Sequence, residues 1–181
     1  MSFAGARSAF RHQSVARQMV AEFKFGGQPV LGRVMAELAG PTFRDYVAGL
    51  GAPGSVLVTW VPAHRSVERE RGYNQAAVLA RALANEAGGL PVAAIARKVA
   101  STRHQQRLDR AGRQANLQGA FRICDTFRFP VGIETLVLVD DVYTTGATSC
   151  EVSSVLAEGT GLPVRVFTFS RASGGSLEGH D

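Results

Sequence analysis

Residues 136–148, with the sequence LVLVDDVYTTGAT, decide the fold of this chain. The apolar run 136–139 favours a strand that is buried on both faces of a parallel sheet. Two carboxylates, Asp140 and Asp141, follow at the carboxyl end of that strand, where α/β sheets bind their ligands. The small-residue loop 144–148 then opens a helix, and the N–H groups of a helix N-terminus favour an anion. This order of strand, acids, loop and helix predicts a site for a phosphorylated sugar.

Gly146 is the residue of this loop that a phosphate site would need most. A Cβ there would keep the backbone away from the ligand or forbid a positive φ. A purely structural interpretation also exists, because paired acids after a strand are often a solvated turn. Thr148 and Glu151 could likewise form a plain capping box. We favour the ligand site because all of its parts occur together in the order that binding needs.

The composition is that of one globular α/β domain. The chain has 181 residues, of which 45% are hydrophobic, enough for one sizeable core. No apolar run approaches the roughly 20 residues that cross a bilayer, and residues 1–13 lack the apolar core of a signal peptide. We therefore expect a cytoplasmic location and no membrane contact. Cys124 and Cys150 stand alone, so they support neither a disulfide framework nor a cysteine-based zinc site.

The positive charge of the chain is concentrated in one window. The formal net charge is +5, which suits an anionic ligand. Residues 97–113 contain a single acid, Asp109, and six cations: Arg97, Lys98, Arg103, Arg107, Arg110 and Arg113. A helix here would have almost no stripe to pack on the core, so we expect the window not to be rigid without ligand. A solvated basic segment and a contact with a nucleic-acid backbone remain alternatives.

Strands and helices alternate in the second part of the chain. The expected strands are 56–61, 92–96, 120–123, 136–139 and 164–169, and the expected helices between them are 74–87 and 147–158. This alternation predicts a parallel sheet with right-handed crossovers. Three helices, 15–25, 30–38 and 42–50, are expected before it. We therefore divide the chain into an N-terminal helical subregion (1–52), an α/β domain (53–172) and a disordered Gly/Ser-rich tail (173–181).

A second ligand loop is expected where the strand 56–61 ends, because this is again the carboxyl edge of the sheet. Arg65 or Arg71 could pair with phosphate oxygens through the planar fork of the guanidinium group. His64 could contribute a hydrogen bond or remain a neutral surface residue, and the sequence leaves both open.

Residues 136–148 resemble the phosphoribosyl pyrophosphate (PRPP) motif of type I phosphoribosyltransferases. The resemblance implies that Asp140 and Asp141 hold the ribose hydroxyls, whereas Tyr143 replaces the usual aliphatic residue. It assigns the ribose phosphate to Thr144, Thr145, Gly146, Ala147 and Thr148. It assigns pyrophosphate to a loop containing Ala63, His64, Arg65 and Arg71. It also implies that the basic window is a mobile hood that closes over the ligand.

Three further stretches resemble the ComF (or GntX) family of phosphoribosyltransferase-like proteins. The first is Val61-Pro62-Ala63-His64 followed by Arg71-Gly72-Tyr73-Asn74-Gln75, and the second is 102–121 with its Thr-x-x-Gln, Arg-x-x-Asn and Gly-Ala-Phe pattern. The third is Phe23-Lys24-Phe25-Gly26-Gly27. The likeness runs from about Val15 to Arg171. Members commonly begin with a four-cysteine zinc ribbon that no residue before Val15 could supply, so either the ribbon is missing or the chain is shortened.

The resemblance implies a type I phosphoribosyltransferase-like fold and binding of PRPP with Mg²⁺. The metal would be held by oxygens of the ligand and by no protein residue directly. The implied reaction is pentosyl transfer to an unknown acceptor with release of pyrophosphate, and its catalytic residues would be Asp140, Asp141, Arg65 and Arg71. A non-catalytic PRPP or nucleotide sensor is one alternative. A DNA-uptake accessory protein of competence that binds single-stranded DNA is another, and homodimerisation is left open.

Overall fold

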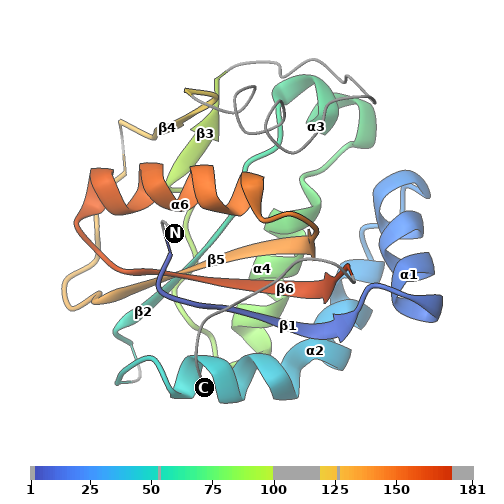
Figure 1. Ribbon diagram of the computed structural model, residues 1–181, viewed down its shortest axis with the longest axis horizontal. Coiled ribbons are helices and arrows are strands. Elements are labelled where there is room, and N and C mark those ends of the chain that lie inside the picture. Colours follow the sequence, from blue (N-terminus) through green and yellow to red (C-terminus); the bar gives the residue numbers. More distant parts are fainter. Residues whose placement is uncertain (1–2, 53, 100–118, 126, 173–181) are drawn as a thin grey trace.

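The computed structural model describes residues 3–52, 54–99, 119–125 and 127–172, which form an α/β fold (Figure 1). Its main sheet has the strand order β1-β6-β5-β2. These strands are β1 (Ala6–Arg11), β6 (Val164–Arg171), β5 (Thr135–Tyr143) and β2 (Val56–Trp60). All three neighbouring pairs are parallel. The expected α/β class, a parallel sheet flanked by helices in the manner of type I phosphoribosyltransferases, is confirmed.

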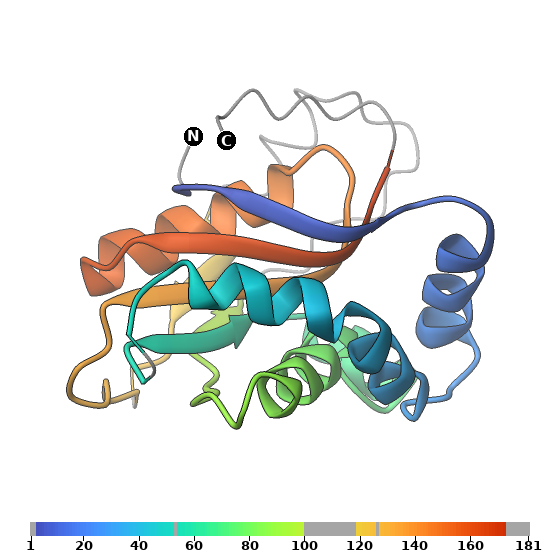
Figure 2. The same ribbon diagram turned by 90° about the horizontal axis from the view of Figure 1, so that it is seen from below.

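Helices cover both faces of the sheet. α2 (Leu31–Ala48) and α4 (Gln75–Glu86) lie on one face, and α6 (Ala147–Thr160) lies on the other (Figures 1 and 2). Successive side chains of a strand point to opposite faces. On β5, Val137 and Val139 therefore join the core beneath α2 and α4, while Leu136 and Leu138 join the core beneath α6. The apolar run 136–139 is the central, doubly buried strand that its composition predicts.

The N-terminal region contributes a strand that its sequence does not predict. Only helices are expected within residues 1–52, yet β1 forms the edge of the main sheet beside β6. The residues of β1 are half-exposed or exposed, and even Phe10 is 37% exposed. The strand therefore lacks the clear alternation of apolar and polar residues by which a half-buried strand is predicted. α1 (Ser14–Phe25) follows at the carboxyl edge of the sheet, where the arrows of β1 and β6 end (Figure 1). The N-terminal region is thus part of the same sheet.

α2 corrects the expectation of two helices separated near Pro41. The helix runs unbroken from Leu31 to Ala48 with Pro41 inside it. Proline removes one backbone donor and normally ends a helix. Here Pro41 faces solvent, while buried residues on both sides of it, Met35 and Phe43 among them, pack against the sheet. Packing of the buried face outweighs the local preference.

Two short strands lie outside the main sheet. β3 (Ala96–Lys98) and β4 (Phe121–Ile123) form an antiparallel pair. The expectation that every strand joins one parallel sheet is therefore wrong for these two. Of the expected strand 92–96, Val92 makes only an isolated parallel bridge to Val58 of β2. The chain then leaves β2 and buries Ile95 in the core beneath α6.

Two expectations fall outside the described residues. The four hood arginines, Arg103, Arg107, Arg110 and Arg113, belong to the segment 100–118, and the expected tail is 173–181. Among the residues that are described, no helix combines the length and the apolar character that a bilayer crossing requires.

Candidate functional site

The paired acids lie at the carboxyl end of β5. Asp141 is 5% exposed and Asp140 is partly exposed. The Asp141 N–H donates a hydrogen bond to Asp140 Oδ1 over 2.9 Å, which fixes the Asp140 carboxyl group against the backbone of its neighbour. Lys24 Nζ of α1 lies 2.7 Å from Asp141 Oδ2. The acids therefore sit in a fixed arrangement with one cation already bound to them.

Burial changes the titration of this pair. Desolvation, and then the nearby Asp141 carboxylate, raise the pKa of Asp140 from 3.8 to about 8, although Lys24 opposes the shift. Burial penalises a charged carboxylate, and a neighbouring carboxylate makes a second negative charge harder to form. The pair therefore holds one proton more readily than two separate aspartates would. A ligand that brings positive charge or hydroxyl donors would favour full ionisation.

The loop after the acids has the shape that an anion site needs. Gly146 has a φ of 75° and is the residue that precedes α6. A Cβ added there would lie 2.6 Å from Tyr143 Cζ, so the backbone and the neighbouring ring both require glycine. Having no side chain, Gly146 cannot cap the first helical turn, and Thr145 Oγ1 meets only the Ala147 N–H, at 3.4 Å. The first N–H groups of a helix have no acceptor within the helix, so those of this turn can receive one from a ligand.

The capping-box alternative for this loop is wrong. α6 begins at Ala147, so Thr148 lies inside the helix and is not the residue that caps it. Glu151 Oε1 instead accepts a hydrogen bond from the Gly119 N–H over 3.2 Å. Glu151, which would have completed the capping box with Thr148, thus ties α6 to the segment that leads into β4.

The expected pyrophosphate loop is shorter than the sequence suggests. Residues from Arg65 to Arg71 form α3, so Arg65 and Arg71 are the two ends of a helix. His64 caps this helix, because its Nδ1 accepts a hydrogen bond from the Ser66 N–H over 3.3 Å. This hydrogen bond gives His64 a structural role, and its contact with a ligand stays a prediction. The loop itself is confined to the residues between β2 and α3.

The Arg71-Gly72-Tyr73-Asn74-Gln75 stretch has a structural explanation residue by residue. Gly72, with a φ of 81°, ends α3, and Asn74 Oδ1 accepts from the Ala77 N–H over 3.2 Å to begin α4. Asn74 Nδ2 also donates to the Val61 carbonyl over 3.3 Å. Gln75 Oε1 accepts from Arg71 over 3.1 Å. The stretch thus joins two helices and holds an arginine near the acids.

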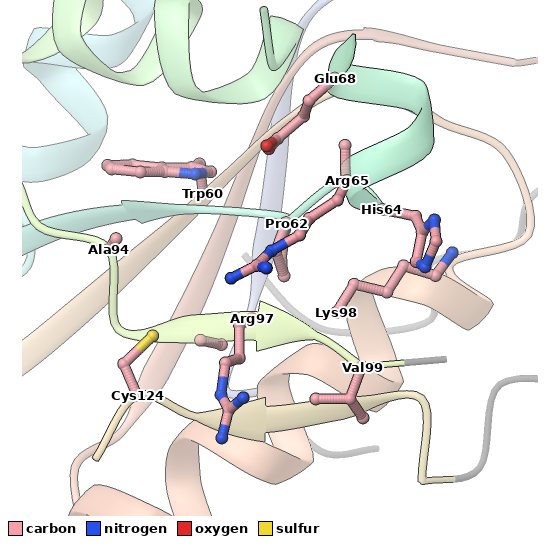
Figure 3. A pocket seen from close by; sticks show the side chains of 12 residues that line it. Trp60, Pro62, His64, Arg65, Glu68, Ala94, Arg97, Lys98, Val99 and Cys124 are labelled. Carbon is pink, nitrogen blue, oxygen red and sulfur yellow. The ribbon is translucent and has the colours of Figure 1, made fainter. Parts of the chain in front are cut away.

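Two cavities open on either side of the loop between β2 and α3. The acid pocket has a volume of about 140 Å³ and is lined by Lys24, Arg71, Asn74, Gln75, Asp140 and Asp141, besides loop and helix residues. The cationic pocket has about 470 Å³ and contains His64, Arg65, Glu68, Arg97, Lys98 and Cys124 in its lining (Figure 3). Pro62 and Ala63 line both. The two pockets share this loop as a common wall.

This arrangement divides the residues that the sequence grouped together. Arg71 lines the acid pocket with Asp140 and Asp141, whereas Arg65 lines the cationic pocket. In Figure 3 the Arg65 side chain extends from the start of α3 toward β3, while Arg97 turns away from it. Arg97 pairs with Asp125 over 3.2 Å. Burial lowers the pKa of Lys98, because desolvation penalises its charged form.

One charged residue of the site, Lys24, is not among the predicted site residues. Lys24 belongs to the stretch 23–27 that resembles the ComF family, and that resemblance assigns it no role. Its position in the last turn of α1, followed by Gly26 and Gly27, indicates a helix end and says nothing of the acids more than a hundred residues later. Only the packing of α1 at the carboxyl edge of the sheet brings Lys24 to Asp141. No local signal could have found this contact.

Comparison with known proteins gives relatives that cover most of the chain. "Competence protein F" of Haemophilus influenzae is 31% identical over 157 residues, which are 85% of this chain and 67% of that protein. "DNA utilization protein YhgH" of Salmonella typhi is 28% identical over 153 residues, 84% of this chain and 66% of that protein. The protein of the same name in Salmonella typhimurium is 32% identical over 123 residues, 68% of this chain and 52% of that protein.

These relatives are longer than the matched region. The chain spans about two thirds of the first two proteins and about half of the third. No family model matched the chain. Nevertheless, the similarity to competence protein F extends over 85% of this chain, and 31% of the residues in that region are identical. On this similarity, the chain belongs to the ComF family.

Proposed function

We propose that the protein binds PRPP with Mg²⁺ and that the ribose occupies the acid pocket. The observation that carries this proposal is the adjacency of two features at one sheet edge: the Asp140–Asp141 pair and the Gly146 loop. Carboxylates accept hydrogen bonds from the two hydroxyls of a ribose, and the N–H groups of the helix start donate to its phosphate. A single phosphorylated sugar can satisfy both features at once.

We assign the diphosphate of PRPP to the cationic pocket. From a ribose in the acid pocket, the diphosphate would pass over Pro62 and Ala63, the wall that both pockets share. Arg65 and Lys98 on the far side carry the positive charge that a diphosphate needs. The cations on the two sides of this wall, Arg71 in the acid pocket and Arg65 and Lys98 in the cationic pocket, would both act on the diphosphate.

A buried donor in the acid pocket also supports a polar ligand. Gln75 is 5% exposed, and its Oε1 accepts from Arg71. Among the described residues no acceptor pairs with its Nε2. An unpaired buried donor costs about 1–3 kcal/mol. A ligand oxygen in the acid pocket would remove this cost.

The residues present fit a magnesium ion that arrives with the ligand. Within the described ranges no group of three or more His, Cys, Asp or Glu side chains could hold a metal. Mg²⁺ would take its oxygens from the diphosphate and ribose, as it commonly does at phosphate sites. Its chemistry there would be to neutralise part of the diphosphate charge. The protein would contribute position and charge through its own side chains.

We further propose that bound PRPP reacts by pentosyl transfer. The bond from the anomeric carbon to the diphosphate oxygen breaks, the electron pair leaves with pyrophosphate, and the acceptor forms the new bond to that carbon. Asp140 and Asp141 would orient the ribose and offset the positive charge that develops on the ring. Arg65 and Arg71 would stabilise the negative charge of the leaving group from the two sides of the shared wall. The acceptor is unidentified.

Calorimetric titration with PRPP and Mg²⁺ tests the binding. We expect saturable binding by the wild-type protein and a loss of about 100-fold or more in affinity for the D140N/D141N variant, because charged hydrogen bonds to the ribose disappear. Circular dichroism should show an unchanged fold. If the double variant bound PRPP as tightly as wild type, Asp140 and Asp141 would not belong to the binding site. Release of pyrophosphate on addition of candidate acceptors would then separate a transferase from a sensor that binds without turnover.

A second candidate function is handling of single-stranded DNA during competence. The relatives named for competence and DNA utilization favour it, as do the exposed arginines Arg65 and Arg97 around the cationic pocket. Contacts with the phosphate backbone would weaken steeply as salt rises. A fluorescence anisotropy titration with an oligonucleotide at several salt concentrations tests this. Salt-insensitive or absent binding would contradict it, and competition by PRPP would place the DNA at the same cavity.

A further inference from the structure

Lys24 reaches the acid pair from a part of the chain that carries none of the other residues of the ligand site. It lies in the last turn of α1 and lines the acid pocket. Its Nζ approaches Asp141 Oδ2 to 2.7 Å, and its side chain is 29% exposed. The ion pair is thus made at the mouth of the pocket with a carboxylate that is almost completely buried.

Two neighbours of Lys24 fix its position. The preceding residue, Phe23, is fully buried, and its carbonyl accepts a hydrogen bond from the Tyr73 hydroxyl over 2.5 Å. The following residue, Phe25, lies beneath the Arg71 guanidinium at 5.1 Å from the ring centre. Both partners belong to the stretch that joins α3 to α4. The end of α1 is therefore held against the wall of the acid pocket on both sides of Lys24.

The ion pair uses one particular oxygen of Asp141. Oδ2 is taken by Lys24, so Oδ1 is the Asp141 oxygen that this contact does not use. On Asp140, Oδ1 accepts the Asp141 N–H. The oxygens left outside these two contacts are one from each acid. This is the number that a pair of ribose hydroxyls would need.

Several charged groups share these surroundings. From the residues before α1, His12 is close enough for Lys24 and Arg17 to lower its pKa, after the larger effect of burial, and for Asp141 to raise it. From α3, Arg71 lines the same pocket. On Asp140 itself, Lys24 is the cation that opposes the pKa rise caused by burial and by Asp141. Lys24 thus acts on both acids.

We propose that Lys24 is a positioning residue of the ligand site: its ammonium group holds the Asp141 carboxylate by Oδ2, so that the other oxygen of Asp141 is left to receive a ribose hydroxyl. The inference rests on the proposed binding of PRPP. It makes α1 a working part of the site, because the N-terminal helix supplies the cation that pairs with Asp141 and opposes the rise in the pKa of Asp140.

The test compares K24M with K24R and with R17M, which removes one exposed charge from the same helix. PRPP–Mg²⁺ affinity is measured by calorimetry from about pH 6 to about pH 9, a range that brackets the titration of the acid pair. We expect K24M to bind about tenfold more weakly at neutral pH, as for a lost charged hydrogen bond. The loss should shrink as pH rises, because Lys24 opposes the rise in the pKa of Asp140, so Asp140 ionises only at higher pH when the ammonium group is removed. K24R should stay within about threefold of wild type, because it keeps the charge, and R17M should match wild type.

Three outcomes would overturn the inference. Equal binding by K24M and wild type at every pH would overturn it and leave the proposed function standing. Weaker binding by K24M with an unshifted pH profile and a lowered melting temperature would reduce Lys24 to a structural anchor. Absence of PRPP binding by the wild-type protein would overturn both the inference and the proposed function. If K24M does not fold, K24Q, which keeps a hydrogen-bond donor and loses the charge, replaces it in the same series.

Discussion

The acid pocket and the cationic pocket lie on two sides of one loop and are built in opposite ways. In the acid pocket, Asp141 is 5% exposed and its contacts come from its own strand and from Lys24. In the cationic pocket, Arg65 and Arg97 are exposed, and Arg97 pairs with an exposed acid. The first pocket holds its polar groups in fixed directions, whereas the second offers charge on long side chains.

This difference indicates how each pocket would recognise its part of a ligand. Fixed, buried acceptors distinguish a hydroxyl pair by geometry, because an unsuitable group leaves them unpaired. Exposed arginines and lysines attract phosphate oxygens by charge and adjust to their positions. We therefore expect changes in or beside the acid pocket to abolish recognition and changes in the cationic pocket to weaken it.

Among single substitutions, the largest effect is expected for G146A. The new Cβ would meet the Tyr143 ring, and the backbone would keep a φ of 75° that alanine rarely adopts. We expect PRPP affinity to fall about 100-fold and the free energy of unfolding to fall by about 2 kcal/mol, measured by calorimetry and by chemical denaturation. G161A is the matched control, because Gly161 ends the same helix at a φ of 72° with open space around it. It should cost about 1 kcal/mol of stability and no affinity; similar affinities of the two variants would remove the loop from the site.

Stability should depend on pH through Asp140. Its pKa is raised from 3.8 to about 8 in the folded protein, so in this range the folded state binds the proton more tightly than the unfolded state. Its contribution to the free energy of unfolding is therefore present below the unfolded pKa and is lost as pH rises through the folded pKa. Denaturant titrations of wild type and D140N should show a steeper decline in the wild-type protein. If the free energy of unfolding changed with pH in the same way in wild type and D140N, the raised pKa of Asp140 would be contradicted.

A smaller effect is expected for R65A in the cationic pocket. Removing one charged contact to the diphosphate should weaken PRPP binding about tenfold. Affinity for ribose 5-phosphate, which lacks the diphosphate, should be unchanged. R69A is the control, because Arg69 is exposed on the same helix and lines neither pocket. If R65A weakened both ligands equally, the two pockets would not divide the ligand between them.

The smallest effect is expected for N74A. Asn74 caps α4 and donates to the Val61 carbonyl, so it supports the wall between the pockets. Loss of the cap should lower the free energy of unfolding by about 1 kcal/mol, measured by thermal or chemical denaturation. N74D, which keeps the acceptor for the helix N–H, should recover most of this loss. No recovery by N74D would mean that the Val61 contact matters more than the cap.

The sequence predicted the parts of the site that lie close together along the chain. The strand, Asp140 and Asp141, and the Gly146 loop occupy the positions expected for them, because each depends on local composition and on the general rule that ligands bind at the carboxyl edge. The helix expected at 74–87 is also confirmed as α4, which Asn74 caps. These features carry their signal within a few residues.

Features that depend on packing could not be predicted in this way. β1 has a weak apolar alternation because it is an edge strand, and α2 continues through Pro41 because its buried face is held by the sheet. The separation of Arg65 from Arg71 follows from α3, whose seven residues include none that is buried and hence no apolar periodicity. The Lys24–Asp141 contact joins residues that only the complete fold brings together.

A crystal structure of the protein with PRPP and Mg²⁺ is the most direct test of the proposal that one ligand occupies both pockets. We expect the ribose hydroxyls within hydrogen-bonding distance of Asp140 and Asp141, and the 5′-phosphate on the N–H groups of residues 144–148. The diphosphate should cross Ala63 toward Arg65. A diphosphate seated in the 144–148 loop, or a ligand that leaves the acid pocket empty, would contradict this division.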